Sequence, residues 1–219
     1  YEMINQFGFR GPDFSEQKPK NTYRIFIAGS SVAYGQHIHQ DETISSHLQK
    51  LFDAQNLELD IEVINAAFPN AWSETEVKWI KNNVNNYEPD LVIVLDGLSD
   101  ITRELVKNAD WNENANIKNW TTRWIELCQF GKENGFDTVV TIQPILGSSN
   151  KFFSNQESME WQHHPYQVTH VELLKKYADN LDKIRSSCTK TADLTNIFKE
   201  YFFSGAFCFP TLISLYHNI

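Results

Sequence analysis

The sequence predicts an α/β domain in which a parallel β-sheet is covered by helices on both faces. Short apolar runs alternate with longer segments of helical period along the 219 residues, and this alternation is typical of βα units. Residues 91–95 are five consecutive apolar residues, as expected for a central strand that is buried on both faces. A chain of this length fits one medium-sized domain, so residues 1–219 are interpreted as a single unit.

The apolar pattern also indicates where each element of this domain begins and ends. It predicts five strands, over residues 23–28, 61–68, 91–95, 138–143 and 192–194. It predicts four helices, over residues 41–55, 73–87, about 120–134 and about 165–188. Ser73 and Glu76 have the spacing of a capping box at the start of the second helix, and Gly135 is expected to end the third. The count corresponds to four or five βα units in one sheet.

Residues 145–164, between the fourth strand and the last helix, show no clear period. Connections in α/β units usually take about 2 to 6 residues, so this segment is too long for an ordinary one. We therefore predict that residues 145–164 form a lid or a binding loop.

The charge balance argues against a nucleic-acid partner. The chain has 19 basic and 28 acidic residues and a formal net charge of -9, whereas binding to phosphates needs a concentration of Lys and Arg. A membrane-spanning helix requires roughly 20 apolar residues, and no run of that length is present, so no spanning segment is predicted. Because the sequence begins at Tyr1 rather than Met, an upstream leader or anchor stays open, and the compartment with it.

The three cysteines, Cys128, Cys188 and Cys208, are widely spaced and odd in number. This pattern indicates neither a disulfide framework nor a Cys-x-x-Cys metal site. At least one thiol is expected to be free.

The turn after the first predicted strand carries a candidate nucleophile. In an open parallel sheet, ligands bind beyond the carboxyl ends of the strands. Residues 29–35 follow the first strand with the sequence Gly-Ser-Ser-Val-Ala-Tyr-Gly and lead toward a helix. Such a turn can present a hydroxyl and backbone N–H groups to a reacting carbonyl, so Ser31 is the candidate.

This turn resembles the nucleophile block of SGNH (GDSL-like) hydrolases, with Ser31 at the position of the nucleophile. The upstream residues 8–11, Gly-Phe-Arg-Gly, are similar to a lead-in found in a branch of that family. With later blocks in order, the resemblance spans nearly the whole chain. It implies a three-layer α/β/α domain with a flavodoxin-like parallel sheet, acting without a cofactor on a small-molecule ester or a glycan-like ligand. Members of this family cleave or transfer acyl esters of lipids and carbohydrates.

The resemblance also assigns the groups that would stabilise an oxyanion, which are Ser31, Asn70 and Ser99. Asn70 stands in the place of a family glycine that donates its backbone N–H, and that N–H survives the change. Ser99 stands in the place of a family asparagine and is a shorter donor.

The last family block is an Asp-x-x-His pair, and the segment that aligns with it has Gly205 and Cys208 at the two positions. Glycine has no side chain, and a thiol with a pKa of about 8.5 is a poor proton acceptor for a serine at neutral pH. In a studied serine protease, loss of the base alone lowers turnover on the order of a million-fold. The resemblance therefore implies an ester hydrolase with weak or lost activity.

Two alternatives stay open. An active esterase or deacetylase would need a substitute base, for which the candidates are His37, His39, His163 and His164. A non-catalytic ligand-binding or scaffold domain would keep the fold alone, and as a scaffold it is expected to press bulky side chains onto Ser31. The spacing of the same histidines is too unspecific to predict a metal site.

Overall fold

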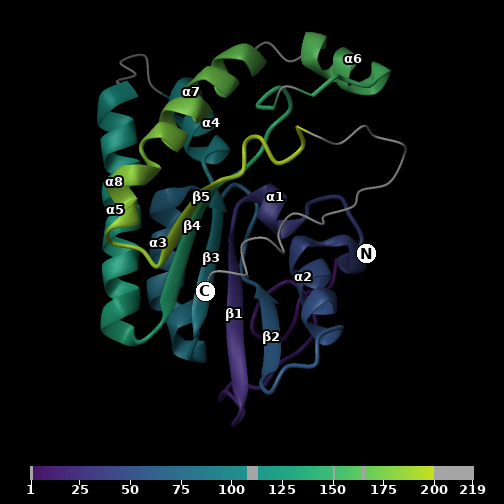
Figure 1. Ribbon diagram of the computed structural model, residues 1–219, viewed down its shortest axis with the longest axis vertical. Coiled ribbons are helices and arrows are strands. Elements are labelled where there is room, and N and C mark those ends of the chain that lie inside the picture. Colours follow the sequence, from purple (N-terminus) through teal and green to yellow (C-terminus); the bar gives the residue numbers. More distant parts are fainter. Residues whose placement is uncertain (1, 108–112, 150, 164–165, 200–219) are drawn as a thin grey trace.

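The computed structural model describes residues 2–107, 113–149, 151–163 and 166–199, and they form a twisted parallel sheet between helices (Figure 1). The strands are β1 (Thr22–Gly29), β2 (Asp60–Asn65), β3 (Leu91–Asp96), β4 (Asp137–Ile142) and β5 (Lys190–Asp193). Their order is β2-β1-β3-β4-β5, and every neighbouring pair is parallel. This is the flavodoxin-like order, so the predicted fold class is confirmed.

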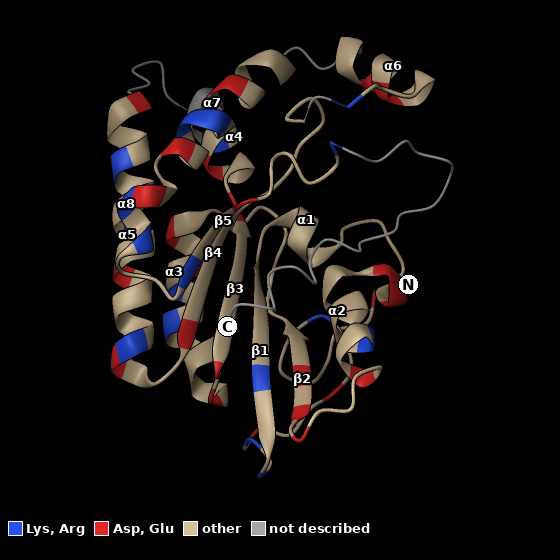
Figure 2. Ribbon diagram, viewed as in Figure 1, with Lys and Arg blue, Asp and Glu red and all other residues tan. Residues whose placement is uncertain are grey.

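Five of the helices that cover the sheet correspond to the four helical segments that the sequence predicts, and three were not predicted. The helices are α1 (Ser31–Tyr34), α2 (Ile44–Asp53), α3 (Ser73–Asn82), α4 (Leu98–Lys107), α5 (Glu113–Asn134), α6 (Asn155–His163), α7 (Gln167–Asp179) and α8 (Leu181–Arg185). Two 3-10 turns, η1 (Gln40–Glu42) and η2 (Val84–Tyr87), complete the list. Figure 2 shows acidic and basic residues interspersed along α2, α5 and α7. Among the described residues, no helix combines the length and hydropathy needed to cross a bilayer.

Alternate residues of β1 pack into two separate cores. Phe26 belongs to the larger core, together with Trp120 and Trp124 of α5. Ile25 belongs to the smaller core, together with Phe52 of α2. Because successive side chains of a strand point to opposite faces, these contacts show that β1 is buried on both sides. The result is three layers, with the sheet in the middle.

Several predicted boundaries differ from the structure for local reasons. The predicted helix over residues 165–188 is broken at Asn180, between α7 and α8. Helix α6 lies inside residues 145–164 and was not predicted, because none of its residues is buried and it therefore has no apolar face to detect. The capping box at Ser73 was wrong: the Ser73 hydroxyl donates to Asp100 instead, and Glu76 is buried.

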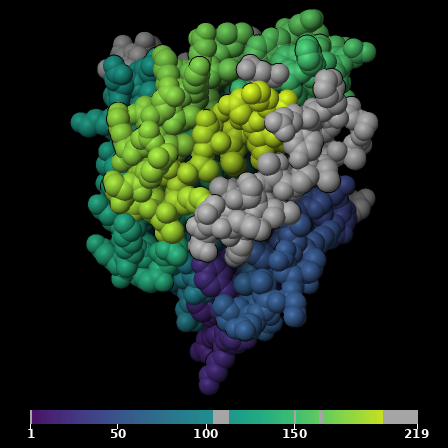
Figure 3. Space-filling model, in the orientation of Figure 1, coloured from purple at the N-terminus to yellow at the C-terminus, as the bar shows by residue number. Residues whose placement is uncertain are grey.

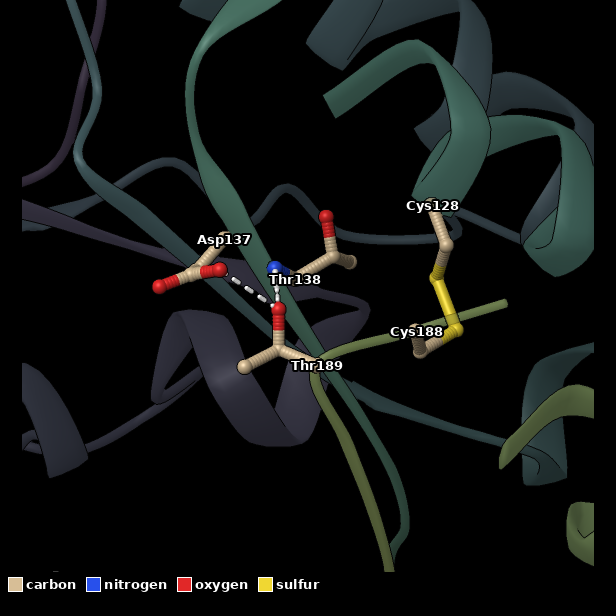
Figure 4. Close-up of a disulfide and its surroundings, with 5 residues drawn as sticks. All are labelled: Cys128, Asp137, Thr138, Cys188 and Thr189. Carbon is tan, nitrogen blue, oxygen red and sulfur yellow. Dashed lines mark hydrogen bonds between the residues drawn. A yellow bond between two sulfur atoms is a disulfide. The ribbon is translucent and has the colours of Figure 1, made fainter. Parts of the chain in front are cut away.

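The sequence indicated no disulfide, and this was wrong, because Cys128 and Cys188 form one (Figure 4); the expectation that at least one thiol is free stays a prediction. Their Cα atoms lie 4.8 Å apart although the residues are separated by 60 positions in sequence. Cys128 lies on α5 and Cys188 lies just before β5, so packing of the helix layer against the sheet brings them together. Cys208 lies outside the described residues.

Candidate active site

Ser31 is the first residue of α1 and follows β1 at the carboxyl edge of the sheet. β1 lies between β2 and β3, so the connection from β1 leads to one side of it and the connection from β2 leads back to the other. In such sheets, ligands bind beside the strand end where the order changes direction in this way. Gly29 has φ +149°, and a Cβ there would lie 2.5 Å from the Leu95 carbonyl oxygen. Only glycine allows the turn to pass this close to the end of β3.

The Ser31 side chain is half-buried, and no residue in the described part of the chain hydrogen-bonds to its hydroxyl. The backbone around it is well ordered by hydrogen bonds. The Ser31 carbonyl accepts from the N–H groups of Gly35 and Gln36, both at 3.0 Å. Ser31 therefore lies in a defined turn and is partly exposed.

The two other predicted oxyanion groups leave neighbouring strands at the same edge. Asn70 follows β2 and has φ +63°, a left-handed conformation that asparagine tolerates better than most residues. Ser99 lies in the first turn of α4, directly after β3, and is half-buried. Because β1 lies between β2 and β3, the segments that carry Ser31, Asn70 and Ser99 emerge side by side.

A buried carboxylate, which the sequence analysis missed, ties two of these segments together. Asp100 of α4 accepts a hydrogen bond from the Ser73 backbone N–H at 2.8 Å and another from the Ser73 hydroxyl. The Arg123 guanidinium lies 3.5 Å from the same carboxylate. Ser73 begins α3, just after Asn70, and Asp100 follows Ser99 directly. The contact therefore sets the spacing between the two loops that carry Asn70 and Ser99.

Two further carboxyl groups lie close to Asp100 in the protein interior. Asp96 ends β3 and accepts a hydrogen bond from the Trp120 indole at 2.8 Å. Glu76 of α3 is buried, and neither of its carboxylate oxygens has a hydrogen-bond partner among the described residues. Glu76, Asp96 and Asp100 are not arranged to hold a metal ion, and neither is any other group of three His, Cys, Asp or Glu side chains in the described part of the chain.

The environment of this cluster favours the protonated carboxyls. Burial raises the pKa of Glu76 well above its ordinary value, and the nearby charges of Asp96 and Asp100 raise it further. Burial also raises the pKa of Asp96, with a second contribution from Asp100. For Asp100, burial raises the pKa while the hydrogen bonds from Ser73 and the charge of Arg123 oppose the rise. Asp100 is therefore the member best suited to carry the negative charge.

In the described part of the chain, none of the candidate bases forms a hydrogen bond with Ser31. His37 is exposed and has φ +68°. His39 accepts a hydrogen bond from the Asp41 backbone N–H through Nδ1, at 3.4 Å. His163 is exposed on α6, with Nδ1 2.7 Å from the Met159 carbonyl oxygen. Three further predicted positions, His164, Gly205 and Cys208, lie outside the described residues, so the identity of the base stays a prediction.

A cavity of about 530 Å³ lies beside the carboxyl end of β4. Residues from the predicted lid line it, together with Phe198, which follows β5. Figure 3 shows α6 and the segment after β5 on the same face of the molecule. The loop that precedes α6 is joined to that segment by the Ser148 hydroxyl, which donates to the Thr195 carbonyl at 2.7 Å. The cavity wall includes four apolar residues and a Lys–Glu ion pair: Pro144, Ile145, Leu146, Phe198, Lys151 and Glu157.

Trp161 holds α6 against the loop that precedes it. Its ring lies 5.4 Å from the ring of Phe153, measured between centroids. It also occupies the space beside Gly147, where a Cβ would lie 2.0 Å from the indole. The segment over residues 145–163 is thus packed through its own side chains, as compact surface loops are.

Comparison with known proteins supports the fold through structure. No family model matches the sequence, and no curated protein matches it. A mutant of Axe2, an acetyl-xylooligosaccharide esterase from Geobacillus stearothermophilus, matches with a TM-score of 0.59 and 13% identity over 82% of this chain and 81% of that one. The acetyl xylan esterase AlAXEase matches with a TM-score of 0.55 and 13% identity over 81% and 80% of the two chains.

TesA is a third structure of this kind, with a TM-score of 0.54 and 13% identity over 84% of this chain and 85% of that one. At 13% sequence identity, the structural similarity to these proteins establishes the fold alone. The chain has the three-layer α/β/α fold of the SGNH hydrolases, as the resemblance of its sequence blocks implies.

Proposed function

We propose that this protein is an SGNH-type ester hydrolase in which Ser31 is the nucleophile and turnover is slow. The observation that supports the proposal best is the position of Ser31, half-buried at the carboxyl end of β1 between the segments that carry Asn70 and Ser99. The slow turnover follows from Gly205 and Cys208 at the aligned positions of the family's aspartate and histidine. The partial exposure of Ser31 does not favour the scaffold alternative, which expects bulky side chains pressed onto this residue.

The proposed reaction proceeds in two steps. The Ser31 Oγ attacks the carbonyl carbon of the ester, its proton passes to water or to a substitute base, and the alcohol leaves with a proton. Backbone N–H groups of Ser31 and Asn70 and the Ser99 hydroxyl donate to the oxyanion that forms. Water then attacks the acyl-serine, releases the carboxylic acid and restores the Ser31 hydroxyl.

The proposed substrate is an uncharged acyl ester of a small alcohol or a carbohydrate. Two of the similar structures act on acetylated xylan or xylooligosaccharides by their names. Ser31 is not among the residues that line the cavity beside β4, but the predicted lid that lines it carries Glu157 and Glu160, and these carboxylates disfavour an anionic ligand. Phe198 adds an aromatic ring that could stack on a sugar. In this proposal residues 145–164 act as the lid over the ligand.

The test compares wild type with Ser31→Ala and Ser30→Ala in turnover of a nitrophenyl acetate and in labelling by a fluorophosphonate. Ser30 is a matched control, because it is adjacent, buried and makes no side-chain hydrogen bond at the start of α1. Turnover and labelling are expected in wild type and Ser30→Ala and are expected to vanish in Ser31→Ala. Equal turnover in all three proteins would refute the proposal.

A second experiment tests why turnover is slow. Added imidazole supplies a proton acceptor, so it is expected to raise the Ser31-dependent turnover. The double change Gly205→Asp and Cys208→His restores the family pair and is expected to do the same. If neither change has an effect, and one of the variants His37→Gln, His39→Gln, His163→Gln or His164→Gln removes the activity, the active esterase with a substitute base replaces this proposal.

A further inference from the structure

We infer that Arg10 is a positioning residue for the proposed nucleophile, because its buried guanidinium holds the backbone that follows Ser31 and thereby sets where the hydroxyl points. This inference rests on the proposed function in one respect, namely that Ser31 is the reacting group. In the sequence, Arg10 belongs to the Gly-Phe-Arg-Gly lead-in, and the family resemblance gives it no role.

The Arg10 guanidinium donates all its hydrogen bonds toward the end of the Ser31 turn. Its Nη1 donates to the carbonyl oxygens of Tyr34 at 3.1 Å and Gly35 at 2.5 Å. Its Nη2 donates to the Ile38 carbonyl at 2.7 Å, and its Nε donates to the Gln40 side chain at 3.1 Å. The guanidinium carbon also lies 4.8 Å from the centre of the Tyr34 ring.

The turn needs this support because α1 has only four residues. A single helical turn leaves its last carbonyl groups without partners and is not stable by itself. Asn65, at the end of β2, donates through Nδ2 to the carbonyls of Ala33 at 3.3 Å and Tyr34 at 3.2 Å. Arg10 also donates to the Tyr34 carbonyl and to those of Gly35 and Ile38. The two side chains together therefore satisfy the carbonyl groups at the carboxyl end of the turn.

Arg10 is itself fixed in place, so it can act as a rigid support. Its backbone N–H donates to the Asn65 carbonyl at 3.2 Å, which attaches the lead-in to the end of β2. Its side chain has no exposed surface. The preceding Phe9 is buried in the larger core, where it contacts Phe26 of β1.

The way in which the charge of Arg10 is compensated points to a geometric role. The carboxylate that faces it, from Glu2, lies 4.0 Å away, and that side chain is 47% exposed. Arg24, at the opposite end of β1, is equally buried but forms a 2.7 Å ion pair with Glu62. A buried charge without a close counter-ion is an expensive way to stabilise a fold. Arg10 instead directs its donors at one backbone turn.

The test measures labelling of Ser31 by a fluorophosphonate in wild type, Arg10→Met, Arg10→Lys and Arg24→Met. The Arg10 side chain has no exposed surface, so the variants should bind the probe as wild type does but react more slowly. A misplacement of about 1 Å lowers reactivity on the order of 100-fold, so we expect the maximal inactivation rate of Arg10→Met to fall about 10- to 100-fold with an unchanged half-saturating concentration. Arg10→Lys keeps one nitrogen donor group in place of three, so its inactivation rate should lie between those of wild type and Arg10→Met.

Arg24→Met is the matched control, because it removes an equally buried arginine near the amino end of β1, away from the Ser31 turn. It is expected to lower the thermal stability as much as Arg10→Met does while leaving the inactivation rate at the wild-type value. An equal loss of rate in Arg24→Met and Arg10→Met would show a general effect of instability and would overturn the inference.

Amide hydrogen exchange of a peptide covering residues 31–38 tests the support without relying on activity. The N–H groups of Gly35 and Gln36, which bond to the Ser31 carbonyl, are expected to exchange at least about tenfold faster in Arg10→Met and at the wild-type rate in Arg24→Met. Unchanged exchange in Arg10→Met would overturn the inference, and so would faster exchange with an unchanged inactivation rate. An unlabelled wild type would refute the proposed function instead, and exchange would still decide whether Arg10 holds the turn.

Discussion

Reduction of the Cys128–Cys188 disulfide is expected to lower the free energy of unfolding by several kcal/mol. The two residues are 60 positions apart, so the bond closes a loop that contains β4, α6, α7 and α8. In the chain-entropy model, a loop of about 60 residues removes about 14 cal/mol/K from the unfolded state, which corresponds to about 4 kcal/mol at 25 °C. A difference of that size is a large part of the stability of an ordinary domain.

The bond also holds the start of the edge strand β5 (Figure 4). Thr189, next to Cys188, donates through Oγ1 to the Asp137 carboxylate at 2.7 Å and accepts from the Thr138 backbone N–H at 3.2 Å. Both cysteines are buried, so a reductant should reach them slowly in the folded protein and quickly in urea. Loss of the bond is therefore expected to raise hydrogen exchange in β5 before it affects β1.

The assay is urea unfolding followed by circular dichroism, with and without dithiothreitol, on wild type and Cys208→Ser. Cys208 takes no part in the bond, so the control should lose as much stability on reduction as wild type does. Thiol titration in denaturant should find two more thiols after reduction than before it. If the thiol count rises by two but the urea midpoint does not change, the chain-entropy reasoning is refuted.

Two further variants test the buried cluster and the nucleophile turn. Burial raises the pKa of Glu76, so the native state keeps its carboxyl proton at pH values above about 4.3, where the unfolded state loses it. The free energy of unfolding therefore falls by about 1.4 kcal/mol per pH unit until the pH passes the native pKa. Glu76→Gln should therefore be more stable than wild type near pH 8, and urea unfolding should show this gain vanish toward pH 4. Gly29→Ala should lower the thermal midpoint more than Gly135→Ala, because a Cβ at Gly29 meets the Leu95 carbonyl whereas one at Gly135 meets nothing within 4 Å.

Each of these two predictions has an outcome that would contradict it. Glu74→Gln is the control for the pH experiment, since Lys78 lowers the pKa of Glu74 and its variant should show no gain at high pH. A gain in Glu74→Gln equal to that in Glu76→Gln would mean that net charge, rather than burial, is responsible. Equal losses for Gly29→Ala and Gly135→Ala would mean that positive φ alone, rather than the contact with β3, makes glycine necessary.

The sequence alone was sufficient to predict the sheet and the place of the candidate nucleophile. The mainly apolar runs over residues 23–28 and 91–95 correspond to β1 and β3, because a strand that is buried on both faces is apolar along most of its length. Arg24 is the exception in β1, where it pairs with Glu62. Ser31 could be singled out because it follows the first of these runs, and the end of a parallel strand is an edge of the sheet wherever the chain goes next. These are local properties, which short stretches of sequence encode directly.

Only the tertiary structure decided how that position is supported. The contacts of Arg10 with Gly35, of Asp100 with Ser73 and of Cys128 with Cys188 join residues that are 25, 27 and 60 positions apart. Nothing in the spacing of such residues indicates that they meet, because their distance depends on the path of the chain between them. Local patterns could therefore place the candidate hydroxyl, whereas the side chains that hydrogen-bond to the turn after it and the Cys128–Cys188 disulfide arise from packing between elements that are remote in sequence.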